Sequence, residues 1–208
     1  MEYGKKKKSL DAVTIAGLGL LTALVIVLQM LGGFIRFGQF SVSLVLAPIV
    51  IGAALYGVWA GGWLGFVFGV VVLFRDSAIF LAINPLATVV IVLLKGFLAG
   101  LAAGAVYKAL APKNSFLATL AASVVCPVVN TGVFLLGCYL FFMEWVRTMA
   151  EQLNFASVAA FMFGGLVGAN FLFELLTNIV LNPIIMRIIA IRKKHVAGKP
   201  KKGMRGSQ

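Results

Sequence analysis

The composition of this 208-residue chain excludes an ordinary water-facing surface, because 62% of its residues are hydrophobic, 12% are charged and the mean hydropathy is +1.06. The net charge is +12, and the basic residues gather at the chain ends, as in Lys5 to Lys8 and Arg192 to Lys194. Basic residues that flank apolar spans are typical of segments held by anionic lipid, and not of a nucleic-acid-binding surface. We therefore predict an all-α integral membrane bundle of six transmembrane helices that binds no nucleic acid.

The transmembrane spans are predicted from the length of the apolar stretches, since a helix needs about 20 mostly apolar residues to cross the hydrocarbon core. Six stretches meet or approach this length: 10–32, 42–56, 59–74, 86–110, 116–142 and 156–191. The first follows a run of lysines, as a signal peptide does, but it is too long and has no small-residue cleavage site. We divide the chain into a basic cytoplasmic N-terminus (1–9), a six-helix transmembrane domain (10–192) and a basic, disordered cytoplasmic tail (193–208).

The orientation follows from the loops, because positively charged loops stay on the cytoplasmic side. Lys108 and Lys113 fall on the same side as the two basic tails, whereas Arg36, Arg75 and Arg147 fall on the other. An even number of spans also places the two tails together. We expect both termini in the cytoplasm (N-in/C-in), in a multi-pass protein of the bacterial cell membrane.

Small residues at four-residue spacing form flat helix faces on which another helix packs closely. Glycines at this spacing lie within or just before the third, fourth and sixth spans: Gly57, Gly61, Gly65, Gly69, Gly96, Gly100, Gly104, Gly164 and Gly168. Tight internal packing and docking to a partner both explain such faces. In the first span, Ala12 with Ala16 and separately Gly19 with Ala23 form similar faces, which we take as candidates for docking another membrane protein.

Two ionisable residues lie deep within the apolar spans, away from the span ends: Lys95 in the fourth and Glu174 in the sixth. A charge in the membrane is costly unless it is paired or faces a cavity. A structural ion pair between the two residues is one interpretation, and a shared substrate cavity is the other. The two are compatible, since a pair that lines a pocket can exchange partners with a ligand.

Other polar residues lie near these charges in the sequence. Asn170, Glu174, Asn178 and Asn182 follow one another at four-residue steps, which places them along one stripe of a helix. Asn130 and Thr131 lie mid-span near Pro127, where they either hydrogen-bond the backbone carbonyl that the proline leaves free or bind a solute. Arg36 and Gln39 lie in a short outer loop. The predicted substrate-binding residues are Lys95, Asn130, Thr131, Asn170, Glu174, Arg36 and Gln39.

The sequence lacks the motifs of common catalytic sites. It has no glycine-rich phosphate loop, no His-Glu-x-x-His and no Gly-x-Ser-x-Gly elbow. The two cysteines, Cys126 and Cys138, fall inside an apolar span and suit packing better than a disulfide or a metal site. We expect no enzyme activity, no catalytic residue, no cofactor and no bound metal.

The chain resembles the substrate-binding S component of an energy-coupling-factor (ECF) vitamin transporter. The resemblance rests on about six spans in some 200 residues, the basic N-terminus, the small-residue face of the first span, the glycine-rich stretch 60–69 and the polar stretch 170–182. It implies that the first span docks onto a transmembrane coupling protein, and that two ATPase subunits drive uptake by toppling the S component in the membrane.

The resemblance also implies that the protein captures a micronutrient from outside. Lys95 and the outer arginines favour a carboxylate, because a desolvated cation forms a charge-assisted hydrogen bond with it. A small vitamin such as pantothenate or niacin fits this expectation. The alternative is a self-sufficient secondary transporter or small channel in which Lys95 and Glu174 form an ion relay.

Overall fold

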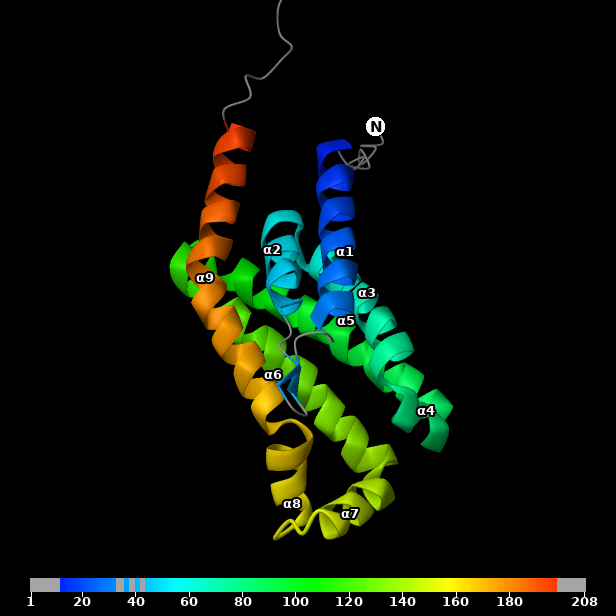
Figure 1. Cartoon of the computed structure of the whole chain (residues 1–208). Coiled ribbons are helices and arrows are strands. Elements are labelled where there is room, and N and C mark those ends of the chain that lie inside the picture. The colour runs from blue at the N-terminus through cyan, green and yellow to red at the C-terminus, as the bar shows by residue number, and fades with distance from the viewer. Residues whose placement is uncertain (1–11, 33–35, 38–39, 42–43, 198–208) are drawn as a thin grey trace, which may run out of the picture.

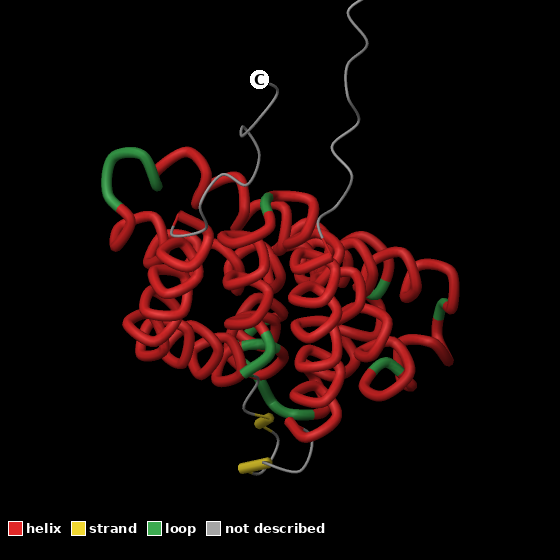
Figure 2. The backbone as a smooth tube through the Cα atoms, turned by 90° about the horizontal axis from the view of Figure 1, so that it is seen from above, coloured by secondary structure: helices red, strands yellow, loops and turns green. Residues whose placement is uncertain are grey.

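The computed structural model describes residues 12–32, 36–37, 40–41 and 44–197, which form a helical bundle (Figure 1). Within this part of the chain, the one departure from helix and loop is a two-stranded antiparallel hairpin, β1 (Arg36–Phe37) and β2 (Phe40–Ser41), which lies at the edge of the helical bundle in Figure 2. The helices are α1 (Ala12–Gly32), α2 (Leu46–Tyr56), α3 (Val58–Asp76), α4 (Ala78–Ile83), α5 (Pro85–Leu110), α6 (Ser115–Phe141), α7 (Met143–Gln152), α8 (Val158–Ala160), the π-helix η1 (Phe161–Leu166) and α9 (Gly168–Ala197).

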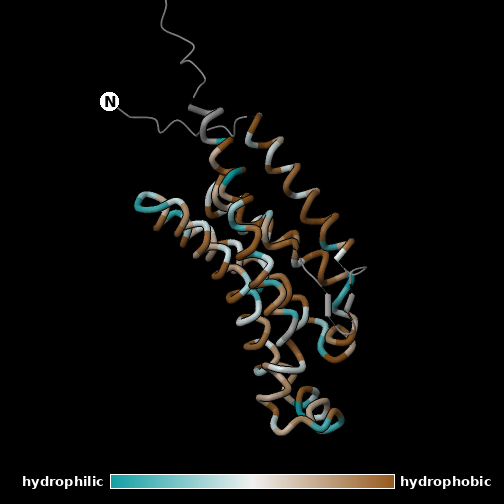
Figure 3. Tube along the Cα trace, turned by 60° about the vertical axis from the view of Figure 1, so that its left-hand side comes forward, coloured by the Kyte–Doolittle hydropathy of each residue, from teal (hydrophilic) through white to brown (hydrophobic). Residues whose placement is uncertain are grey.

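Among the described residues, five helices are long and apolar enough to cross a membrane: α1, α3, α5, α6 and the 170–192 part of α9. Hydrophobic residues run along these helices, and hydrophilic ones concentrate in the connections (Figure 3). The expected membrane bundle is therefore confirmed, and five of the six expected spans have the length of a transmembrane helix. The regular structure of the described ranges is all-helical apart from the small hairpin.

The expected second span differs from the structure, because α2 has only 11 residues and begins at Leu46 instead of Val42. At 1.5 Å per residue it is about 16 Å long, roughly half the thickness of the hydrocarbon core. Every residue from Leu46 to Ala53 is buried against neighbouring helices. The apolar composition of α2 therefore reflects the protein core and not contact with lipid.

The expected sixth span, 156–191, is also not one continuous helix. It starts with the short α8, continues as η1, and breaks at Val167 before α9 begins. Pairs of glycines favour such breaks, and Gly164 and Gly165 lie inside η1. Short π-helical turns in membrane and soluble helices often lie at functional sites.

The glycine faces of α3 and α5 pack against each other, so these glycines serve internal packing. A Cβ atom at Gly61 would lie 2.5 Å from the Gly100 carbonyl oxygen, and one at Gly69 would lie 2.7 Å from the Val92 carbonyl oxygen. A Cβ at Gly65 would collide with the backbone of Gly96. The two backbones therefore touch, which is how small residues hold helices together in lipid.

A methyl group at this interface is expected to separate the helices. We predict that Gly65→Ala destabilises the protein by about 1–3 kcal/mol, the usual cost of overpacking a tight contact. Gly19→Ala in α1 is the matched control, because nothing lies within 4 Å of a Cβ at that position. Thermal unfolding in detergent checks this, and equal midpoints for the two variants would contradict it.

Helix α1 is attached to α3 by polar contacts near its C-terminal end. Arg75 Nη1 donates to the carbonyl oxygens of Gln29, at 2.8 Å, and of Met30, and Gln29 Nε2 donates to Asp76 Oδ2 at 2.9 Å. The last carbonyls of a helix lack partners within it and attract cations. Of the α1 side chains, only Val25 is buried, so most of α1 faces outward.

Candidate functional site

A cavity of about 120 Å³ lies between α5, α6 and the start of α9, and we call it the polar cavity. Its lining residues are Lys95, Asn130, Thr131, Phe134, Leu166, Val167, Asn170, Phe171 and Glu174. Three helices supply the polar groups: α5 the ammonium, α6 an amide and a hydroxyl, and α9 an amide and a carboxylate. Polar side chains from three helices, which are 35 or more residues apart in the sequence from one helix to the next, therefore converge on one small cavity.

Five of the seven predicted binding residues line this cavity: Lys95, Asn130, Thr131, Asn170 and Glu174. Asn170 and Glu174 face the cavity together because they lie one helical turn apart on α9. The other two cannot be placed, since Gln39 lies outside the described residues and Arg36 is described only as backbone in β1.

The lower members of the predicted polar stripe do not reach the cavity. Asn178 and Asn182 are both buried further along α9, and Asn178 Nδ2 donates to the Glu174 backbone carbonyl oxygen at 2.8 Å. Asn182 sits directly before Pro183, inside the continuous α9. These two residues contribute to the packing of α9 instead of the cavity.

Lys95 lies beside an aromatic ring in the cavity. Its Nζ atom is 4.9 Å from the centroid of the Phe134 ring, a distance at which the ring face stabilises a cation. Within the described ranges, Arg75 Nε and Asp76 Oδ1 form an ion pair at 4.0 Å, whereas no such contact joins Lys95 to Glu174. The ammonium and the carboxylate thus face a shared space without touching each other.

Asn130 presents an unused hydrogen-bond acceptor to the same cavity. Only 5% of this residue is exposed, and its Oδ1 atom has no hydrogen-bond partner in the part of the chain that the structure describes. A buried polar atom without a partner costs free energy, so such atoms usually point to a missing ligand or water. Pro127, one turn earlier in α6, cannot donate a backbone hydrogen bond to this oxygen, because proline has no N–H.

A second cavity of about 550 Å³, here called the aromatic cavity, adjoins the polar cavity. The two share Leu166, Val167 and Asn170, at the end of η1 and the start of α9. The rest of its lining is mostly apolar: Ile79, Trp145, Leu153, Phe155, Phe161, Gly164 and Gly165. No pattern in the sequence predicted this cavity.

The π-helical turn shapes the aromatic cavity. A Cβ atom at Gly165 would lie 2.8 Å from atoms of both the Phe155 and Phe161 rings, so glycine leaves the room in which these rings pack. Their centroids are 5.4 Å apart, and Trp145 lies 6.4 Å from Phe161. The cavity therefore has rigid aromatic walls on one side.

Comparison with known proteins identifies the family. Residues 13–192 match the family model described as "ECF transporter, substrate-specific component". The chain belongs to this family. It is accordingly a substrate-specific (S) component, a multi-pass protein of the cell membrane and not an enzyme, as the sequence resemblance predicted.

Among solved structures, ThiT from Listeria monocytogenes is similar to this S component. The two share 19% sequence identity with a TM-score of 0.63, and the match covers 88% of this chain and 96% of that chain. At this identity the likeness shows the fold alone. No curated protein matches the sequence.

S components bind a substrate and associate with an ECF module. Ala12, Ala16, Gly19 and Ala23, the predicted docking residues, are all exposed on α1. At about 100° per residue they fall within about 60° of one another around the helix. The two small faces expected from the sequence are thus one continuous stripe.

Proposed function

We propose that this S component captures a small carboxylate-bearing micronutrient, such as the vitamins pantothenate or niacin, in the polar cavity from outside the cell, for ATP-driven uptake. The observation that carries the proposal is the convergence of the Lys95 ammonium and the partnerless Asn130 oxygen on one cavity. The ammonium binds the solute carboxylate through a charge-assisted hydrogen bond. The amide oxygen accepts a hydrogen bond from a hydroxyl or amide N–H of the solute.

The remaining predicted binding residues complete this site in the proposal. The polar groups of the solute form hydrogen bonds with the Glu174 carboxylate and with the Asn170 and Thr131 side chains. Arg36 and Gln39, on the loop that carries the hairpin, add a cation and an amide from the outer side. Strand β2 lies against α9, which supports this placement of the loop.

The solute also extends into the aromatic cavity. A volume of about 120 Å³ is smaller than usual ligand pockets, which measure about 300–1,000 Å³, whereas the adjoining cavity of about 550 Å³ falls within that range. The carboxylate therefore lies at Lys95, and the bulky or ring portion lies among Trp145, Phe155 and Phe161. Such a solute is amphipathic, with one charged end.

The stripe of small residues on α1 docks the transmembrane coupling protein, which carries the two ATPase subunits. Helices in lipid associate through such small residues, and Gly19 has open space around it. Both termini lie in the cytoplasm in this arrangement, with residues 1–9 and 193–208 as basic segments on either side of the transmembrane domain 10–192.

Trp145 provides a direct test of binding. Trp59→Phe with Trp63→Phe leaves Trp145 as the one tryptophan, because the chain has three, and both replaced residues lie on α3 outside the two cavities. We expect pantothenate or nicotinate to change Trp145 fluorescence saturably in detergent. Pantothenol or nicotinamide, which lack the carboxylate, are expected to bind about tenfold or more weakly, since a hydrogen bond to a charged group contributes about 1.5–3 kcal/mol.

Mass spectrometry of solute released from the purified protein provides an independent check. A released compound with a carboxylate and an apolar or ring portion agrees with the proposal. Equal affinity for the acids and their neutral counterparts, or a released compound that is cationic, would contradict it.

A further inference from the structure

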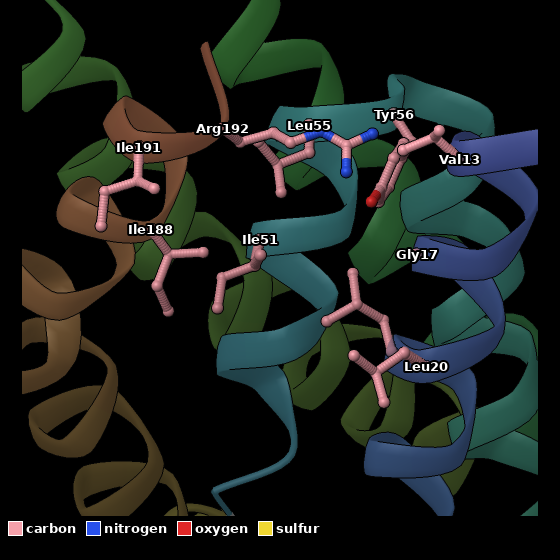
Figure 4. Close-up of a pocket in the computed structure, with 10 residues that line it drawn as sticks. Val13, Gly17, Leu20, Ile51, Leu55, Tyr56, Ile188, Ile191 and Arg192 are labelled. Carbon is pink, nitrogen blue, oxygen red and sulfur yellow. The ribbon is translucent and has the colours of Figure 1, made fainter. Parts of the chain in front are cut away.

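A groove lies between α1, α2 and α9, at the opposite end of α9 from the polar cavity (Figure 4). Its volume is about 550 Å³. The lining residues are Val13, Gly17, Leu20, Leu21, Ile51, Leu55, Tyr56, Ile188, Ile191 and Arg192. None of them lines the polar or aromatic cavity, so this groove, here called the α1–α9 groove, is a separate feature.

The α1–α9 groove is polar at one end and aliphatic along the rest. Figure 4 shows the Arg192 guanidinium and the Tyr56 hydroxyl at one end, with Ile188, Ile51 and Leu20 further along. The guanidinium carbon lies 5.3 Å from the Tyr56 ring centroid. Gly17 makes room for this arrangement, because a Cβ at that position would collide with the Tyr56 hydroxyl.

The charge of this end of the protein is positive. Arg187, Lys193 and Lys194 flank Arg192 along α9, and none of the described residues that line the groove is acidic. Two membrane-spanning helices form the groove walls, and their side chains at the groove edge are exposed, as for Leu20, 72%, and Ile191, 54%. The groove therefore opens sideways toward the bilayer, with its cation at one end.

We propose that the α1–α9 groove binds an anionic phospholipid. One acyl chain lies along the aliphatic residues, and the phosphate accepts hydrogen bonds from the Arg192 guanidinium and the Tyr56 hydroxyl. Guanidinium binds phosphate in a bidentate manner, and basic residues beside a transmembrane helix attract anionic headgroups. The groove side of α1 is turned about 100° from the stripe of small residues, so lipid and coupling protein occupy different faces of this helix.

The test uses native mass spectrometry of the full-length protein in detergent, with added phosphatidylglycerol or phosphatidylcholine of the same acyl chains. We expect phosphatidylglycerol to bind preferentially, and Arg192→Gln to reduce this preference about fivefold, the value of one basic residue near a headgroup. Arg187→Gln is the matched control, since Arg187 is exposed on the same helix and does not line the groove. Ile188→Trp, which fills the aliphatic part, is expected to reduce binding of both lipids.

Each other outcome overturns the proposal. Equal binding of the two lipids by the unaltered protein would show that the Arg192 guanidinium does not select an anionic headgroup. A preference that survives Arg192→Gln but is lost in Arg187→Gln moves the headgroup site elsewhere. If neither lipid stays bound, the groove is left as a surface for a protein partner.

Discussion

Lys95→Met is expected to abolish capture of the carboxylate solute while the bundle remains folded. Methionine keeps the length of the side chain and its contact with Phe134 but removes the ammonium. Loss of one partner from a buried, hydrogen-bonded charge pair costs about 2–5 kcal/mol, so the affinity falls by a factor of about 30 or more. Titration of pantothenate or nicotinate against Trp145 fluorescence measures this change.

Two further variants make the Lys95 result specific. Lys108→Met removes an exposed ammonium near the end of the same helix, outside the polar cavity, and is expected to bind as the unaltered protein does. Glu174→Gln keeps one side-chain oxygen as an acceptor for the solute but removes the negative charge that faces Lys95, so affinity for an anionic solute is expected not to fall. An equal loss in the Lys95 and Lys108 variants would show that the polar cavity is not the binding site.

Ala16→Trp and Ala23→Trp are each expected to prevent assembly with the coupling protein and the ATPases. Both residues lie exposed in the small-residue stripe of α1, where an indole would hold a partner helix away. Close approach of backbones is the main attraction between helices in lipid, so assembly is expected to fall about tenfold or more. Co-purification with the tagged ATPase subunits measures it.

The control for docking lies on the same helix. Leu24→Trp changes an exposed residue that lies about 100° around α1 from Ala23, and assembly is expected to persist. Solute binding in detergent should be unchanged in all three variants, because α1 contributes no residue to the polar or aromatic cavity. Intact assembly of both alanine variants would show that another face docks the partner.

The sequence predicted which polar side chains meet in one cavity because charges are rare in the apolar spans of this chain. A lysine and a glutamate in separate apolar spans must both avoid lipid, and this constraint alone indicates that they face a common interior. Four-residue spacing then added Asn170 to the same face as Glu174. Phe134 was missed, although it lies one turn after Asn130 and the same spacing predicts it.

The aromatic cavity and the short helices could not be predicted in the same way. An apolar run does not reveal whether its surroundings are lipid or protein, so α2 was assigned four residues too many at its start. The π-helical η1 depends on how Gly165 accommodates the rings of Phe155 and Phe161, which are tertiary contacts. The expected spans leave 143–155 without a helix, whereas residues 143–152 of this connection form the amphipathic α7.

The shortness of α2 has a consequence for how specificity can change in this family. A helix of about 16 Å covers roughly half of the hydrocarbon thickness, so other parts of the chain fill the remainder. In Figure 1 the hairpin β1–β2 lies below α2, where its second strand contacts α9. Irregular backbone at such depth must be enclosed by protein or border an aqueous space. Loops accept new sequences more readily than packed helices do. Under the proposed function, exchange of the hairpin β1–β2 is therefore expected to change which nutrient is recognised while the glycine-packed contact of α3 and α5 stays unaltered.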